Sequence, residues 1–181
     1  MTLEVMGLRG RVQMLDGGLG AWRSAGRPLT SERPAVSRGD VTLTPRDDVL
    51  VDADWIHARL DDDRVALVDA RPDDEYTGED GGMNGMANPG HIPGAHQMYW
   101  EELVHSRAVP TVLPRAELAE LFAAADAREG DTVVAYCMVG WRASFTYVAA
   151  RMLGYETKFY DGSWHDWGSR DLPYVTGTSP R

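Results

Sequence analysis

The chain has 181 residues and a formal net charge of −10 at pH 7; 43% of its residues are hydrophobic and 25% are charged. This composition is that of an ordinary globular protein of about one domain, and no apolar run is long enough to predict a membrane span. The negative charge argues against a nucleic-acid partner, and it means that an anionic substrate would need a locally positive pocket. The single cysteine, Cys137, cannot form an internal disulfide, which fits a reducing compartment, so we expect a cytoplasmic protein.

The first 26 residues resemble a later part of the same chain. The sequence DGGLGAW at 16–22 recurs as DGSWHDW at 161–167, and each copy follows a short apolar run, 12–15 or 157–160, that we expect to be a strand. Chance is the alternative, because Asp-Gly is a common turn dipeptide. If the repeat is real, residues 1–26 are the remnant of an N-terminal domain similar to the one that follows.

A polar, proline-punctuated stretch follows this repeat and predicts a linker over 27–45. The charge changes there as well, because residues 1–40 carry six arginines against four acidic residues while the rest of the chain is strongly acidic. We therefore expect one main domain over 46–176, followed by a short tail at 177–181.

Short apolar strands alternate with helices in this main domain. The pattern predicts a helix that Asp52 caps and that runs to about Leu60, and another that begins at Pro114. Three strands are predicted, at 65–68, 132–136 and 157–160. A third helix is predicted over 143–153, and Gly154 marks its end. This order predicts an α/β domain with a mainly parallel sheet, in which ligands bind at the carboxyl ends of the strands. Asp69 and Cys137 stand at two such ends.

Cys137 stands between the predicted strand 132–136 and the predicted helix 143–153, in the segment YCMVGWRAS. Backbone N–H groups converge in such a turn, and Gly140 permits the φ values that the turn needs. These amides, the positive end of the helix and Arg142 favour an anionic sulfur, which can attack a sulfur atom and keep it as a persulfide. The alternative for a lone cysteine is a small buried hydrophobic residue.

Four segments resemble the rhodaneses, which are thiosulfate sulfurtransferases. CMVGWR at 137–142 looks like their six-residue active-site loop, and VDAR at 68–71 matches the Asp-x-Arg at the end of their early strand. GHIPGAH at 90–96 matches their signature turn, and YDGSW at 160–164 matches a motif near their C-terminal end. The resemblance covers about residues 50–175, with the motifs in the family's order.

The resemblance implies a rhodanese-like three-layer α/β fold, with a mainly parallel central sheet flanked by helices. It also implies that residues 1–26 end the first domain of a tandem enzyme whose second domain, here 46–176, is catalytic. Cys137 would take a sulfane sulfur from a small anionic donor such as thiosulfate and pass it to cyanide or a thiol acceptor. That acceptor would be a small thiol or a thioredoxin-like protein.

Two arginines would bind the donor according to the same resemblance. Arg71 would hold the donor's sulfonate, and Arg142 would add positive charge at the loop. The alternative for Arg71 is a structural ion pair with Asp73, Asp74 or Glu75.

The other residues expected in the site either support the loop 137–142 or are part of it. Asp69 and His91 would fix the loop conformation through hydrogen bonds. No His/Cys cluster has the spacing of metal ligands, so we expect neither a metal nor a cofactor. The remaining expected substrate contacts come from the loop itself: Met138, Val139, Gly140 and Trp141.

Four positions depart from the pattern of thiosulfate-specific enzymes or of their mercaptopyruvate-specific relatives. Many thiosulfate enzymes have a basic residue where this chain has Val139, and a second arginine where it has Glu75. Mercaptopyruvate sulfurtransferases have a small neutral loop, whereas this loop contains Trp141 and ends in Arg142. We therefore favour thiosulfate or a related sulfane donor, with 3-mercaptopyruvate as the alternative.

Two other functions compete with the sulfurtransferase. A cysteine phosphatase needs five residues between its cysteine and arginine, and only four separate Cys137 from Arg142. A sulfur carrier or binding module with little turnover is the second, because most of a tandem enzyme's first domain would be missing. The glycine-rich segment Gly78–Gly90 is either a mobile lid or a disordered surface loop.

Overall fold

The central sheet has five strands and all of its neighbouring pairs are parallel. The computed structural model describes residues 1–80 and 88–181, so the lid predicted over Gly78–Gly90 lies largely outside the described residues. In space the strands follow the order β1-β5-β4-β2-β3. Their bounds are Leu50–Val51 (β1), Val65–Asp69 (β2), Ala95–Gln97 (β3), Thr132–Tyr136 (β4) and Glu156–Tyr160 (β5).

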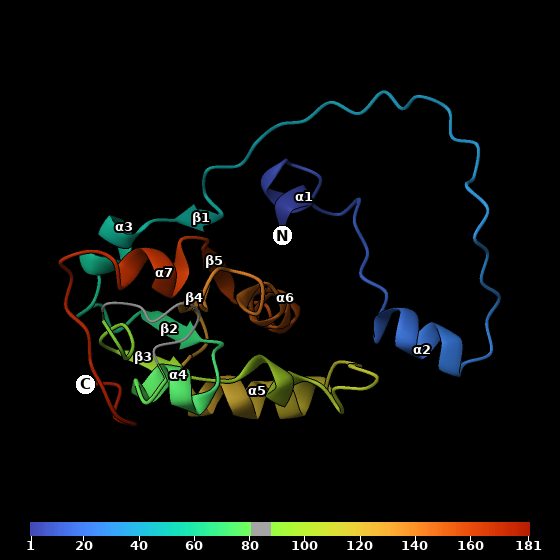
Figure 1. The fold of residues 1–181 in the computed structure, drawn as a ribbon. Coiled ribbons are helices and arrows are strands. Elements are labelled where there is room, and N and C mark those ends of the chain that lie inside the picture. The colour runs from blue at the N-terminus through green and yellow to red at the C-terminus, as the bar shows by residue number, and fades with distance from the viewer. Residues whose placement is uncertain (81–87) are drawn as a thin grey trace.

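Helices cover both faces of this sheet, which confirms the three-layer α/β fold (Figure 1). The helices of the main domain are α3 (Ala53–His57), α4 (Asp73–Thr77), α5 (Arg115–Ala124), α6 (Ala143–Leu153), α7 (Ser163–Trp167) and the 3-10 turn η1 (Trp100–Leu103). On one face α3 and α7 pack against the strands through Ile56, Trp164 and Trp167. On the other face α5 and α6 pack through residues that include Phe122 and Ala149.

The interior strands β2 and β4 are mostly apolar because both of their faces are buried. In β2, Leu67 points to the layer of α3 and α7, while Ala66 and Val68 point to the layer of α5 and α6. Successive strand residues alternate between faces, so a central strand with a helix layer on each side needs an unbroken apolar run. The runs 65–68 and 132–136 therefore predicted the two central strands correctly.

Helix ends mostly follow their sequence signals. Asp52 accepts the Trp55 N–H at 2.8 Å as an N-cap, and Gly154 ends α6 with a φ of 98°. The predicted extension of α3 to Leu60 is wrong, because the helix ends at His57. The Arg59 N–H bonds to the Ile56 carbonyl instead, and the chain turns there to enter β2.

The N-terminal segment forms two short helices, α1 (Thr2–Val5) and α2 (Gly18–Ser24). The connection from α2 to β1 arches away from the domain without regular structure (Figure 1). Glu4 of α1 forms an ion pair with Arg151 of α6, and the Arg46 N–H bonds to the Val5 carbonyl at 2.7 Å. These contacts attach α1 to the domain.

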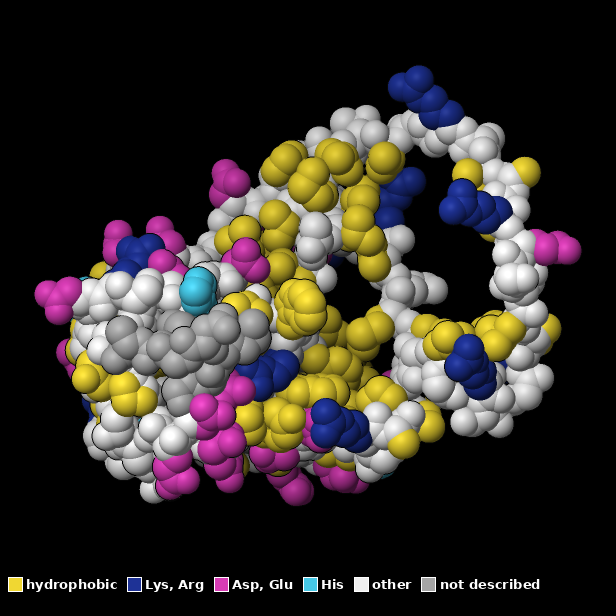
Figure 2. All heavy atoms as spheres, in the orientation of Figure 1, with side chains coloured by type: hydrophobic (Ala, Val, Ile, Leu, Met, Phe, Trp, Pro, Cys, Tyr) yellow, Lys and Arg dark blue, Asp and Glu magenta, His cyan; other side chains and the backbone are white. Residues whose placement is uncertain are grey.

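The strand expected over 12–15 is not formed. None of the described strands pairs with this segment, so its backbone N–H and C=O groups lack the partners that a neighbouring strand would supply. The side chains of Val12, Met14 and Leu15 are about half exposed, and Figure 2 shows hydrophobic side chains gathered over the N-terminal part of the molecule.

The two copies of the repeat nevertheless share one backbone feature. Gly18 and Ser163 are the first residues of α2 and α7, and both have a positive φ, 56° and 53°. That residues 1–26 are the remnant of another domain stays a prediction. Among the helices of the described residues, none has the length and apolar character needed to cross a membrane.

Candidate active site

Cys137 lies at the carboxyl end of β4, directly after the last strand residue, and its side chain is buried. The Cys137 N–H donates to the Ser163 Oγ at 3.2 Å, and the Cys137 carbonyl accepts the Trp164 N–H at 2.9 Å. The carbonyl of Met138 accepts the N–H of His165 at 3.0 Å. Three hydrogen bonds therefore fasten the start of the loop to the first turn of α7.

Gly140 closes the loop over the sulfur. Its N–H donates to the Cys137 Sγ at 3.1 Å, as expected for an amide that stabilises a charged sulfur. Its φ of 89° lies in the region that favours glycine, and a Cβ there would lie 3.2 Å from Asp161 Oδ1 and 3.3 Å from Phe159 Cζ. Glycine is thus required at this position both by the backbone conformation and by the neighbouring atoms.

Arg142 ends the loop and is held by Glu75 of α4. Its two terminal nitrogens donate to the two carboxylate oxygens of Glu75 at 2.8 and 2.7 Å, a bidentate pair between half-buried side chains. Burial lowers the pKa of Arg142. The hydrogen bonds and charge of Glu75, together with Cys137, raise the pKa by more than burial lowers it, so it lies above its ordinary value. Arg142 is therefore a cation in the loop, but the carboxylate of Glu75 neutralises its charge.

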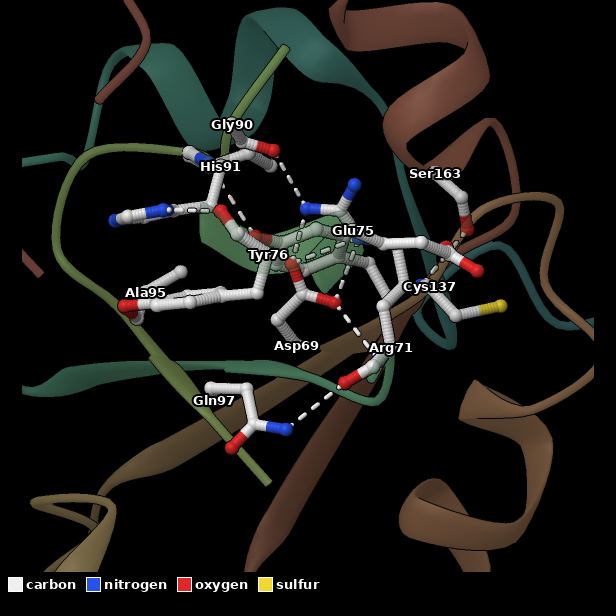
Figure 3. A network of polar contacts seen from close by, with 12 residues as sticks. Asp69, Arg71, Glu75, Tyr76, Gly90, His91, Ala95, Gln97, Cys137 and Ser163 are labelled. Carbon is white, nitrogen blue, oxygen red and sulfur yellow. Dashed lines mark hydrogen bonds and ion pairs between the residues drawn. The ribbon is translucent and has the colours of Figure 1, made fainter. Parts of the chain in front are cut away.

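Arg71 forms a buried ion pair with Asp69, the last residue of β2. The Arg71 Nη2 donates to Asp69 Oδ2 at 2.6 Å and to the Gly90 carbonyl at 2.7 Å, and Nε donates to both carboxylate oxygens (Figure 3). The guanidinium also lies over the ring of Trp164, 4.8 Å from its centre. Burial lowers the pKa of Arg71, but Asp69 raises it more, so the net pKa is raised.

These contacts change the interpretation of Arg71. An ion pair was the alternative for this residue, and the structure supplies one, but the partner is Asp69 rather than Asp73, Asp74 or Glu75. Arg71 is only 1% exposed, and in Figure 3 the sulfur of Cys137 points away from the pair. Binding of the donor by Arg71 stays an untested prediction, while its observed contacts are structural.

His91 lies in the signature turn and joins three parts of the chain. Its ring stacks on Tyr76 with centroids 3.7 Å apart, its Nδ1 lies 2.9 Å from the Tyr76 carbonyl, and its Nε2 lies 3.1 Å from the Ser179 carbonyl. Burial lowers the pKa of His91, and the hydrogen bonds to the two carbonyls only partly oppose this. These contacts support the turn, and among the described contacts of His91 none is with Cys137.

The remaining loop residues divide into buried and exposed ones. Met138 is buried and joins the core between the sheet and α7, whereas Val139 and Trp141 are exposed, Trp141 to 86%. Trp141 lies at an open apolar hollow of about 330 Å³ together with Arg142 and with Trp100, Ser144 and Phe145. Of the expected loop contacts, Val139 and Trp141 are accessible to a ligand and Met138 is not.

Sequence reasoning missed two residues that hold this site. Ser163 accepts the Cys137 N–H, and a signal was present in the motif YDGSW, whose serine stands where the repeat has a glycine. Glu75 was considered as a partner of Arg71, but it binds Arg142, 67 residues further along the chain, which no local pattern indicates. In the described part of the chain no cluster of His, Cys, Asp and Glu could hold a metal ion.

Comparisons with known proteins agree with this geometry. A family model described as the rhodanese-like domain matches residues 52–170. The thiosulfate sulfurtransferase of Azotobacter vinelandii is 36% identical over 174 residues, which cover 94% of this chain and 62% of that protein. A probable 3-mercaptopyruvate sulfurtransferase of Pseudomonas aeruginosa is 35% identical over 167 residues, which cover 91% and 57%.

A similar solved structure is the anaerobic ergothioneine biosynthesis enzyme of Chlorobium limicola in complex with trimethyl histidine. It superimposes with a TM-score of 0.79 at 27% identity, over 93% of this chain and 42% of that chain. The chain spans about three fifths of the length of the curated relatives named above. With the family model matching most of the main domain, the chain belongs to the rhodanese family.

Proposed function

We propose that the protein is a sulfurtransferase that carries a sulfane sulfur on Cys137. The observation that carries this proposal is the Gly140 N–H directed at the Cys137 Sγ from a loop that α7 holds in place. An amide in this position stabilises the sulfur as an anion, both before attack and in the persulfide that follows. The names of the relatives support the same reaction class.

The first half-reaction forms the persulfide. The Cys137 thiolate attacks the outer sulfur of thiosulfate, a new S–S bond forms, and the old S–S bond breaks with its electron pair leaving on sulfite. The charge balances, since a thiolate and a thiosulfate dianion give a persulfide anion and a sulfite dianion. No oxidant or reductant is needed.

The second half-reaction returns the enzyme to its starting form. Cyanide attacks the outer sulfur of the persulfide and leaves as thiocyanate, or a thiolate attacks it and leaves as a new persulfide. The proposed acceptors are small thiols or a thioredoxin-like protein. A reducing cytoplasm is the proposed compartment, because it would keep a lone reactive thiol from oxidation.

Mercaptopyruvate is the second candidate donor, because the relative named for it is nearly as similar as the one named for thiosulfate. Steady-state kinetics with cyanide as acceptor test both. We expect parallel double-reciprocal lines, the mark of alternation between two enzyme forms, with sulfite released from thiosulfate. Faster pyruvate release from mercaptopyruvate would select the other donor, and turnover that persists in Cys137→Ser would contradict the proposal.

A further inference from the structure

Glu75 binds the guanidinium of Arg142, the one cationic side chain in the loop that carries Cys137. Arg142 is the only basic residue in the segment 137–142, and its two terminal nitrogens are both engaged by the carboxylate of Glu75. Cys137 also contributes to the raised pKa of Arg142, after Glu75, so both side chains act on this guanidinium. The three side chains are therefore electrostatically linked.

The charges of Arg142 and Glu75 cancel before any donor arrives, so the thiolate of Cys137 leaves the three side chains with one net negative charge. The side chains of Arg142 and Glu75 are 25% and 15% exposed, so water screens their attraction only in part. A bidentate carboxylate also occupies the geometry that a sulfonate would take on the guanidinium. The other basic side chain near the site, Arg71, is bound to Asp69 in the interior. Among the described residues, the Gly140 N–H that points at the sulfur remains as a donor for an incoming anion.

We propose that Glu75 sets the charge selectivity of the site, so that it prefers monoanionic sulfane donors to dianionic ones. The preferred class comprises thiosulfonates and alkyl persulfides, in which one negative charge accompanies the transferable sulfur. Glu75 is a positioning residue here, because it acts through Arg142. The inference rests on the proposed sulfurtransferase function and goes beyond it by naming the donor class.

The chemistry of a monoanionic donor balances in the same way as that of thiosulfate. The Cys137 thiolate attacks the terminal sulfur of methanethiosulfonate, the S–S bond breaks, and methanesulfinate leaves with the electron pair. Two single negative charges enter, and two leave as the persulfide and the sulfinate. Methanethiosulfonate and thiosulfate differ only by a methyl group in place of one charged oxygen, so they form a matched pair of probes.

The test compares kcat/KM for the two probes in wild type, Glu75→Gln and Glu156→Gln, with cyanide as acceptor. Glu156 is a matched control, because it begins β5 at the opposite end of the sheet and pairs with Lys158. In Glu75→Gln we expect the ratio of thiosulfate to methanethiosulfonate to rise roughly threefold or more, mainly through a lower KM for thiosulfate, as one freed surface charge allows. In Glu156→Gln the ratio should stay at the wild-type value.

A second variant keeps the inference testable if Glu75→Gln fails to fold. Arg142→Gln leaves Glu75 facing the sulfur, so the same ratio should fall below the wild-type value. A ratio that is unchanged in both variants, or that Glu156→Gln changes as much as Glu75→Gln, overturns the role of Glu75. Failure of both probes to form a persulfide on wild-type Cys137 overturns the proposed function itself, which is a distinct outcome.

Discussion

Ser163 joins the loop of Cys137 to α7 through a single hydroxyl. Its Oγ accepts the Cys137 N–H at 3.2 Å and donates to the Tyr160 carbonyl at 2.9 Å, so it links the ends of β4 and β5. The residue keeps a φ of 53° although it has a side chain, which costs backbone energy that the two hydrogen bonds offset.

Replacing this hydroxyl should therefore loosen the site as well as destabilise the fold. In Ser163→Ala the buried Cys137 N–H loses its acceptor, which costs about 1–3 kcal/mol in the free energy of unfolding. We expect slower persulfide formation in stopped-flow measurements with thiosulfate. Ser169→Ala is the control, because that residue is exposed and, among the described residues, its hydroxyl donates to the Asp166 carbonyl alone. Equal rates in the two variants would contradict the role of Ser163.

The Asp69–Arg71 pair should contribute strongly to stability. Asp69→Asn removes the carboxylate and leaves a buried guanidinium without its counter-charge, so the free energy of unfolding in urea should fall by about 3–5 kcal/mol. Asp48→Asn breaks the exposed pair with Arg46 and should change the free energy of unfolding far less, because water screens that pair. A loss below 1 kcal/mol for Asp69→Asn would show that Arg71 does not need this partner.

At the scale of the element, the turn between β4 and α6 determines what Cys137 can do. The strand places the cysteine at the carboxyl edge of the sheet, and the loop curls so that the Gly140 amide meets the sulfur. Two glycines with positive φ flank α6, Gly140 before it and Gly154 after it, at 89° and 98°. Only the first has atoms within 4 Å of an added Cβ.

These two glycines form a matched pair for mutation. Gly140→Ala and Gly154→Ala should each lower the free energy of unfolding by about 1–3 kcal/mol, because alanine is strained at these φ values. Only Gly140→Ala should also slow persulfide formation, roughly tenfold or more, since its Cβ displaces Asp161 or the loop amide. Similar losses of activity in both variants would contradict the assignment of Gly140 to the sulfur.

The sequence predicted the elements that periodicity and caps determine, and missed those that depend on distant contacts. The buried runs predicted β2 and β4 because each strand faces two helix layers, and Gly154 marked the end of α6. The two-residue strand β1 was missed, since it exists only through pairing with β5. For the same reason no local signal linked Glu75 to Arg142, whereas Cys137 stood out through its own neighbours.

At the scale of the molecule, His91 ties the signature turn to α4 and to the C-terminal segment. Its ring lies between the carbonyls of Tyr76 and Ser179, which are over a hundred positions apart in the chain. Burial lowers the pKa of His91 below its ordinary value of 6.5. As the pH falls through 6.5, the unfolded chain therefore takes up a proton before the folded protein does.

This difference predicts a loss of stability on the acid side. The free energy of unfolding should fall as the pH drops from 6.5 towards the lowered pKa of His91, by at most about 1.4 kcal/mol per pH unit for one proton, and His91 should have no effect above that window. Urea titrations between pH 7.5 and 5 should show a shallower decline for His91→Gln. The exposed His105→Gln should follow wild type. A wild-type slope retained in His91→Gln would exclude this residue as the cause.

The chain spans only part of its curated relatives' length, yet its rhodanese-like domain contains the cysteine, the loop and both ion pairs described above. In the N-terminal segment, Glu4 of α1 contacts Arg151 near the C-terminal end of α6. Cys137 lies before the other end of this helix, at the carboxyl edge of the sheet. Sulfur loading of Cys137 is the property that we predict for this chain.

Intact-protein mass spectrometry after incubation with thiosulfate tests that claim most directly. We expect a gain of about 32 Da, the mass of one sulfur atom, located on Cys137 by peptide mapping and removed by cyanide with formation of thiocyanate. Cys137→Ser should show no gain. An unchanged mass in wild type, or a gain that the serine variant retains, would contradict the account.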